Sequence, residues 1–330
     1  MSNIFTTSLP KTVLGFHVYY DLWFDICAVE ADSLSFFPKL SFKTEGSIGG
    51  SNYSENTIYV NENELKKLWA ICYAGYILFE FTRKKKINNI NINEFFITES
   101  DIEEIRAVEH LKWGVGYESK CPENFFDFCP TGNPDDLFYT IYPLFDAAFS
   151  FIAFHEIWHI INKDEVPNIN KFYTERPHLD PNNKNDVKRI KEWEDKSYEI
   201  IDRENQSDTN ARRSLEKLYN NKHPRFQLLG LSFALLYLVT PEILSMLKSP
   251  SSDSLLTHPR GYNRLFNCLS NAISAIDDEG DNSPIYNFTA HLMRQLFPKC
   301  IYQQTKKHPS AKAYLNELCE VIDKKYNVRE

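Results

Sequence analysis

The chain has 330 residues, of which 42% are hydrophobic and 14% aromatic, and its formal net charge is -8. This composition provides enough apolar surface for a sizeable core and excludes a globally disordered chain. The acidic charge argues against a nucleic-acid-binding protein, because neutralising phosphates requires clustered Lys and Arg.

The first 60 residues mix aromatic and β-branched residues with Gly and Ser. This pattern predicts short strands around residues 12–30, 40–44 and 57–60. The glycines between residues 46 and 50 mark a loop or hairpin. We therefore expect a small α/β portion at the N-terminal end of the chain.

A helix is predicted to begin after Asn61 and to run to about residue 84. Asn61 is a suitable N-cap, and Glu64 occupies the third position of a capping box. The basic run at residues 83–86 is interpreted as the solvated end of this helix. Apolar residues at helical spacing predict its buried face, which comprises Leu65, Leu68, Trp69, Cys72, Tyr76 and Phe79.

Two long loops are predicted, at residues 114–134 and 164–185, from their prolines, glycines and polar residues. Between them, a helix should begin near Pro134 and run to about residue 162, with a kink or restart at Pro143. After the second loop, a charged helix is predicted to span about residues 185–220. Further helices are expected near residues 225–248, 259–277, 285–297 and 309–326.

The predicted fold class is α+β and mainly α. Residues 1–95 form the N-terminal α/β portion and residues 96–330 a mostly helical catalytic portion, which we expect to make one continuous globular unit. The apolar stretches 137–161 and 226–239 are interpreted as buried core helices. The first contains charged residues, and the second is shorter than the roughly 20 residues needed to span a membrane.

The seven cysteines are scattered and contain no Cys-x-x-Cys pair, which indicates a reduced protein. The N-terminal residues show no basic segment followed by an apolar one, as a signal peptide would. We therefore expect a cytoplasmic protein with no membrane partner and no nucleic-acid partner. The sequence leaves its oligomeric state open.

The sequence His155-Glu156-Ile157-Trp158-His159 places two histidines four residues apart in a predicted helix. Residues at this spacing lie on one face, so both imidazoles can bind one Zn²⁺ ion. Glu156 points to a different side of the helix, from which it can act as general base on a metal-bound water. The alternative is a pair of hydrogen-bonded core histidines without a metal.

A catalytic zinc requires a third protein ligand, and the charged helix offers Glu204, with Asp208 four residues later. Asp208 could accept the free ring N–H of a ligand histidine. The same helix contains many other acidic residues, so both carboxylates could also belong to a solvated face. The spacing leaves these two interpretations open.

Together, the segments at residues 155–159 and 204–208 resemble the thermolysin-type, or gluzincin, signature His-Glu-x-x-His followed by Glu-x-x-Ser/Ala-Asp. The resemblance implies a zincin-like catalytic core in which Glu204 is the third zinc ligand and Asp208 supports a ligand histidine. In size and layout the chain is similar to the phage-exclusion Lit-type peptidases. Those are bacterial proteins that cleave a translation elongation factor during infection.

A second donor to the transition state is expected from the polar turn that contains His258 and Arg264. The same turn is also typical of an ordinary helix N-terminus. Residues 57–60 are a weaker candidate for a strand edge that receives the substrate, with a plain core strand as the alternative.

We therefore predict a zinc-dependent endopeptidase that hydrolyses an intracellular protein or peptide, with Glu156 activating the water. The alternative is a non-catalytic, zinc-stabilised interaction protein. The absence of a nearby cysteine pair that could complete a four-ligand structural site counts against it. A metal-free, degenerate module is a third hypothesis, and the intact Glu156 argues against that one.

Overall fold

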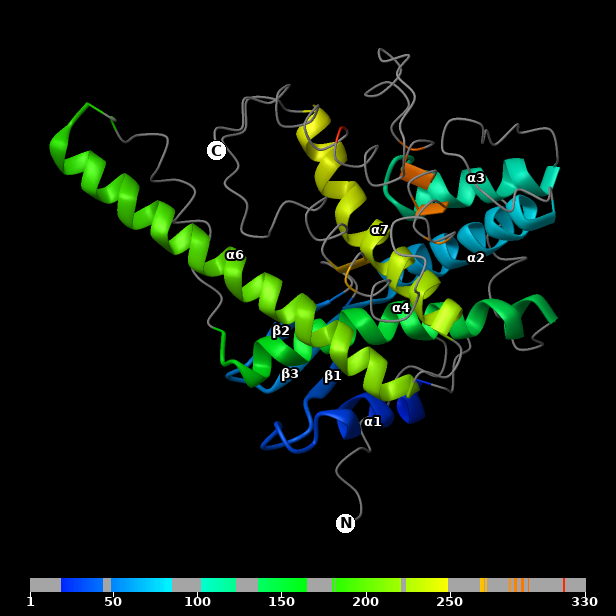
Figure 1. Cartoon of the computed structure of the whole chain (residues 1–330), viewed down its shortest axis with the longest axis horizontal. Coiled ribbons are helices and arrows are strands. Elements are labelled where there is room, and N and C mark those ends of the chain that lie inside the picture. The colour runs from blue at the N-terminus through cyan, green and yellow to red at the C-terminus, as the bar shows by residue number, and fades with distance from the viewer. Residues whose placement is uncertain are drawn as a thin grey trace.

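The computed structural model describes residues 19–43, 49–84, 102–122, 136–164, 180, 182–220 and 224–248, together with single positions at 268, 269, 271, 285, 288, 289, 292, 293, 296 and 317. Over these residues the protein is mainly helical, with one small sheet near its N-terminal side (Figure 1). The predicted fold class, α+β and mainly α, is confirmed. The boundary at residues 95/96 stays a prediction, because nothing observed tests it.

The sheet has three strands in the order β1-β3-β2. They are β1 (Lys39–Lys43), β2 (Gly50–Asn52) and β3 (Thr57–Asn61). β3 pairs in parallel with β1 and antiparallel with β2, so it is the central strand. The two strands predicted at residues 40–44 and 57–60 are thus present, but residues 57–60 do not form an edge.

The first predicted strand is wrong over the part that the structure describes. Residues Tyr19–Val29 form helix α1, and its buried side chains Trp23, Ile26 and Cys27 recur at helical spacing. The aromatic and β-branched content of this segment is typical of a strand, but such short apolar runs fit either structure. Packing against α4 and α6 decides for the helix.

Helix α2 (Glu62–Lys84) begins where the sequence predicts. The Asn61 side chain accepts hydrogen bonds from the backbone N–H groups of Asn63 and Glu64, as an N-cap does. The Glu64 side chain instead contacts Lys67 Nζ and the hydroxyl of Tyr237. The predicted buried face is confirmed, with Leu65, Leu68, Trp69 and Cys72 fully buried.

Helix α3 (Ile102–Gly114) was not predicted, and it packs along α2. Helix α4 (Asp136–Ile161) is continuous through Pro143, so the predicted restart there is wrong. Pro143 lies early in the helix, and its ring is exposed to solvent. A proline at such a position removes a single backbone hydrogen bond without ending the helix.

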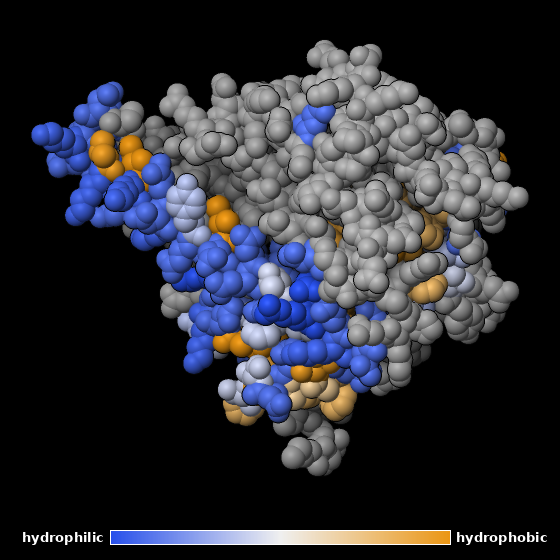
Figure 2. All heavy atoms as spheres, in the orientation of Figure 1, coloured by the Kyte–Doolittle hydropathy of each residue, from blue (hydrophilic) through white to orange (hydrophobic). Residues whose placement is uncertain are grey.

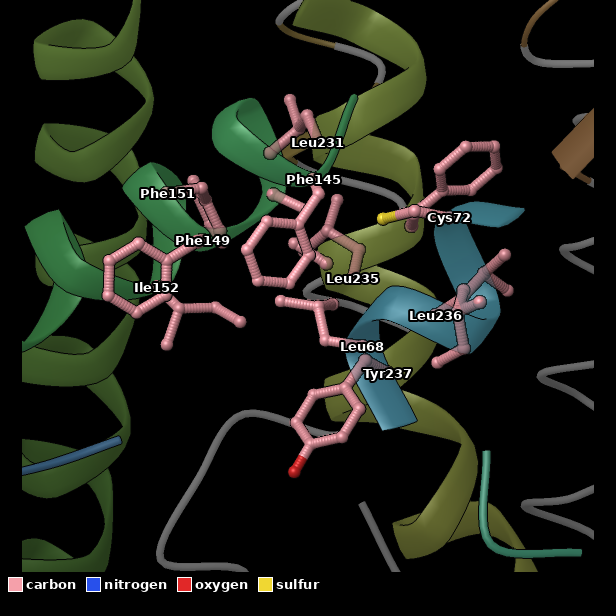
Figure 3. Packing of buried hydrophobic residues seen from close by; sticks show 14 of the residues in the cluster. Leu68, Cys72, Phe145, Phe149, Phe151, Ile152, Leu231, Leu235, Leu236 and Tyr237 are labelled. Atoms are coloured by element: carbon pink, nitrogen blue, oxygen red, sulfur yellow. The ribbon is translucent and has the colours of Figure 1, made fainter. Parts of the chain in front are cut away.

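Helix α4 passes through the middle of the core. It contacts α2, α6, α7 (Pro224–Lys248) and the sheet, and Figure 3 shows Phe145 of α4 close to Leu68 of α2 and Leu235 of α7. Gly230 allows α7 to approach α4 closely, since a Cβ there would lie 2.5 Å from the Cβ of Ala147. Phe145, Phe149 and Phe151 are almost fully buried.

The burial of α4 explains its apolar sequence. Among the described residues, the segment Thr140–Ile161 is long and apolar enough to cross a membrane by length and composition, and 72% of its most apolar window is buried inside the protein. A core helix satisfies the same composition test. Its contacts are those expected of the predicted core helix.

Helix α6 (Lys184–Tyr219) begins at the N-cap Asn183 and ends at Asn220, which has left-handed backbone angles. The predicted charged helix is therefore confirmed, as is the helix predicted near residues 225–248. The N-terminal half of α6 extends away from the other helices (Figure 1). The remaining helix predictions fall mostly outside the described residues, although the single positions described there are helical.

Candidate metal centre

Helix α4 places His155 and His159 one turn apart on the side that faces α6. Their Nε2 atoms lie 3.0 Å apart, and the ring planes are nearly perpendicular, at 82°. His155 is 6% exposed and His159 is partly buried. The two rings therefore aim their nitrogens at one point inside the protein.

Helix α6 brings Glu204 to the same point. Its carboxylate oxygens lie 3.2 Å from His155 Nε2 and 3.4 Å from His159 Nε2. Glu204 is 8% exposed, so it does not belong to the solvated face of this charged helix. Within the part of the chain that the structure describes, these three residues form the only group whose donor atoms could together hold a metal ion.

The separations between these donor atoms fit a tetrahedral metal. Ligands bound to zinc at about 2.0–2.1 Å in tetrahedral geometry lie about 3.3–3.4 Å from one another. The two Nε2 atoms lie 3.0 Å apart, Glu204 Oε2 lies 3.2 Å from His155 Nε2, and Glu204 Oε1 lies 3.4 Å from His159 Nε2. Three protein donors also leave one coordination position for a water molecule or a substrate, as in catalytic sites.

Asp208 supports the first histidine, as its position one turn after Glu204 predicts. Its Oδ1 atom lies 2.9 Å from His155 Nδ1, and its side chain is 2% exposed. Burial, which lowers the pKa of an imidazole, is outweighed in His155 by Asp208 and then Glu204, and the pKa rises to about 10. The surroundings of His155 therefore strongly favour a positive charge, which a proton or a metal ion can supply.

The second histidine has a carboxylate partner that the sequence analysis missed. Asp164 Oδ2 lies 2.9 Å from His159 Nδ1. When both rings are neutral and each donates its Nδ1–H to its aspartate, both Nε2 atoms carry lone pairs that face each other and Glu204. A cation between them would relieve this repulsion, so the chemistry of the donor set fits a metal.

Glu156 lies beside the donor group but is not part of it. Its side chain is half-buried. Burial lowers the pKa of His159, but Glu204, with a smaller contribution from the Glu156 charge, raises it above its ordinary value. Gly49, which precedes β2, approaches Glu156 closely, because a Cβ at residue 49 would lie 3.1 Å from Glu156 Cγ and Oε1. From the sequence, this glycine is predicted only to lie in a loop, since no local pattern reveals a contact between residues so distant in sequence.

Buried hydrogen bonds fix the register between α4 and α6. Trp158 Nε1 donates to Ser214 Oγ at 3.1 Å, and Ser214 Oγ donates to Glu30 Oε1 at 2.6 Å. Lys217 Nζ lies 3.2 Å from the same Glu30 oxygen. These contacts join α1, α4 and α6, so the two helices that supply the donor residues cannot slide past each other easily.

The transition-state candidates His258 and Arg264 lie outside the described residues, as do all other residues of the polar turn that contains them. Their role stays a prediction. The structure brings together His155, His159, Glu204 and Asp208 from the two sequence motifs, adds Asp164, and places Glu156 next to them.

A mainly helical protein in which two helices present two histidines and a glutamate to one point has the architecture of a metallopeptidase-type centre. The family comparison agrees, since the family model for peptidase U49, a Lit-like peptidase family, matches residues 58–289. The chain belongs to this family, and membership implies a peptidase that acts on protein or peptide substrates. The matched segment contains both motifs. No curated protein and no solved structure matches the chain.

Proposed function

We propose that this protein is a zinc-dependent endopeptidase of the gluzincin type, in which His155, His159 and Glu204 bind the metal. The observation that carries the proposal is the convergence of their donor atoms to 3.0–3.4 Å from two different helices. A bound Zn²⁺ ion would polarise the scissile carbonyl and lower the pKa of a water molecule. The residues of the chain provide the remaining chemistry.

Glu156 is the proposed general base, which takes a proton from the attacking water. It is adjacent to His155 in sequence, half-buried, and outside the group of donor atoms. This position supports a catalytic site over the non-catalytic, zinc-stabilised alternative. A structural zinc has four protein ligands and requires no base, whereas the described residues provide three.

The outer edge of β2 is the proposed binding site for the substrate backbone. β2 is an edge strand that contacts α4, and no described strand pairs with its outer side. Gly49, at its start, lies against Glu156. A peptide that adds to this edge as a further strand would pass the general base. β2 thus replaces residues 57–60, which form the central strand, as the candidate edge.

The proposed substrate is an intracellular protein, and the proposed location is the cytoplasm, with no membrane and no nucleic-acid partner. The support is the acidic net charge of -8, the scattered cysteines and the resemblance to the phage-exclusion peptidases. A role in phage exclusion follows from that resemblance and is part of the same proposal.

The decisive experiment is Glu156→Gln, measured for both zinc content and cleavage. The near-isosteric amide should preserve the fold and the metal, while cleavage of proteins in a bacterial extract falls by about 10²–10⁴-fold because an amide is not a base. Glu192→Gln, at an exposed position, is the matched control. Loss of zinc together with stability would favour the non-catalytic alternative, and cleavage at the wild-type rate would remove Glu156 from the mechanism.

Gly49→Ala tests the close approach between the start of β2 and Glu156 separately. The added methyl group must displace Glu156 or Ile152 by a few tenths of an ångström, since each lies 3.1 Å away. Misplacement of a catalytic group by about 1 Å can cost roughly 10²-fold in rate, so we expect a loss of about 10-fold with unchanged zinc affinity. An unchanged rate would contradict the close positioning of Gly49 and Glu156.

A further inference from the structure

Asp164 lies near the donor group but belongs to neither sequence motif. It follows the C-terminus of α4, where Lys163 adopts left-handed backbone angles with φ 55°. The backbone N–H of Lys163 donates to Ile160 O at 3.1 Å, and that of Asp164 donates to His159 O at 2.9 Å. These two bonds form a Schellman-type cap, which turns the chain back so that Asp164 faces the last turn of its own helix.

The turn brings the Asp164 carboxylate to the outer nitrogen of His159. Oδ2 lies 2.9 Å from Nδ1, whereas the Ser207 hydroxyl lies 3.5 Å from the same nitrogen. The carboxylate is both closer and charged, so it is the stronger acceptor of the ring N–H. Its side chain is only 14% exposed, which limits competition from water.

The other carboxylate oxygen of Asp164 faces α6. Oδ1 lies 3.8 Å from Arg203 Nη1, and Arg203 directly precedes the donor residue Glu204. Arg203 also pairs with Glu199 one turn earlier on α6, which holds its guanidinium on this side of the helix. The Asp164 side chain therefore lies next to both His159 of α4 and Arg203 of α6, the residue before Glu204.

We propose that Asp164 is a positioning residue that fixes the ring of His159 for metal binding, and that Arg203 ties it to the helix that carries Glu204. By accepting the Nδ1–H, Asp164 leaves Nε2 unprotonated and directed at the metal position. Each histidine then has its own aspartate, one from α6 and one from the end of α4. This inference rests on the metal site under the proposed function.

The test compares the zinc affinity of four variants with that of the intact chain, by competition with a chromophoric zinc chelator. Asp164→Ala should weaken zinc binding by about 10–100-fold, as loss of such a partner commonly does. Asp164→Asn should have a smaller effect, because its amide oxygen can still accept the ring N–H without the charge. His159→Ala is the reference for loss of a donor residue.

The matched control is Asp202→Asn. Asp202 is an exposed carboxylate on α6 that accepts a hydrogen bond from Gln206, and it contacts neither histidine in the described structure. Its replacement removes the same charge near Glu204 and should leave the zinc affinity within about twofold, since exposed charges interact weakly. A loss as large as that of Asp164→Asn would show that net charge, and not positioning, is responsible, and would overturn the inference.

The melting temperature of the zinc-free protein separates positioning from helix capping. Both Asp164 variants keep the backbone N–H that caps α4, so their zinc-free melting temperatures should fall by a few degrees at most, from the lost contact to His159. If the zinc-free variants are destabilised enough to explain their weaker zinc binding, the inference is overturned. Unchanged affinity in Asp164→Ala would overturn it as well but leave the proposed function intact. An intact chain that binds no zinc would overturn both.

Discussion

Both halves of helix α6 contain acidic and basic residues, but the two halves lie in opposite environments. In residues 184–202, the side chains of Glu192 and Glu199 are each 60% exposed, and this half extends away from the other helices as a largely hydrophilic arm (Figures 1 and 2). In residues 203–219, Glu204 and Asp208 are 8% and 2% exposed. The presence of acidic residues in a helix therefore does not show whether they are exposed to solvent or buried at a site.

The difference follows from what the carboxylates contact. Glu192 and Glu199 pair with Lys188 and Arg203 one turn away on the same helix, interactions that water screens. Burying a carboxylate is costly unless it meets a charge or a hydrogen-bond donor. Glu204 and Asp208 meet the histidines of α4, and the fully buried small residues Ser207, Ala211 and Ser214 allow the helices to come this close.

Replacement of Glu204, the buried donor residue of α6, should lower the zinc affinity most. Glu204→Gln replaces a charged ligand oxygen by a neutral amide, and one ligand of a zinc site contributes roughly a quarter of about 10–16 kcal/mol. Zinc affinity should therefore fall by more than about 100-fold. The same substitution at Glu192, in the exposed half, should leave it unchanged. Equal effects at the two positions, measured by chelator competition, would contradict the comparison.

Asp208→Ala should have the next largest effect. It removes the partner of His155 Nδ1 but no donor atom, so zinc affinity should fall by about 10–100-fold. Glu192→Ala is the control in the exposed half of the same helix. If Asp208→Ala keeps the wild-type affinity, burial in this half of α6 does not indicate a functional role.

The pH dependence of zinc binding tests the contact between Asp208, in the buried half of α6, and His155. The raised pKa of His155, about 10, means that zinc must displace a proton below that pH. Affinity should therefore rise with pH, by up to about tenfold per unit for this one proton. Asp208→Ala removes a cause of the raised pKa and should flatten the slope. A slope that stays the same in this variant would contradict the assigned contact.

The folding stability of the zinc-free protein should fall as the pH rises, whereas the zinc affinity rises. The folded-state pKa of His155 is raised above its unfolded value of 6.5, so its contribution is fully present below pH 6.5 and is lost as the pH rises towards about 10. Urea unfolding across this range, with a chelator present, measures the effect. Stability that increases over this window in the intact chain, but not in His155→Ala, would contradict the assignment.

The smallest effect is expected from the exposed pair Lys188–Glu192. Its atoms lie 3.7 Å apart, and both side chains are mostly exposed. Glu192→Gln should change the free energy of unfolding by less than about 0.5 kcal/mol and leave zinc binding intact. A larger loss of stability, seen in urea unfolding, would mean that the arm contributes more to the fold than its exposure indicates.

Several elements were predictable because their signals are local. The Asn61 cap and the helical spacing of the apolar residues in α2 each depend on residues that lie within a few positions of one another. The segment at residues 19–29 failed because a short apolar and aromatic run satisfies strand and helix patterns alike. α3 was missed because only its packing against α2 identifies its buried face.

For the candidate site, the sequence by itself determined the pair His155 and His159 and the adjacent Glu156, because four-residue spacing on a helix fixes their relative directions. Only the tertiary structure decided which acidic residues of α6 join them, that Asp164 turns back to His159, and that Gly49 lies against Glu156. The reason is physical. Helix periodicity relates residues within one element, whereas burial and contacts between elements depend on how distant segments pack.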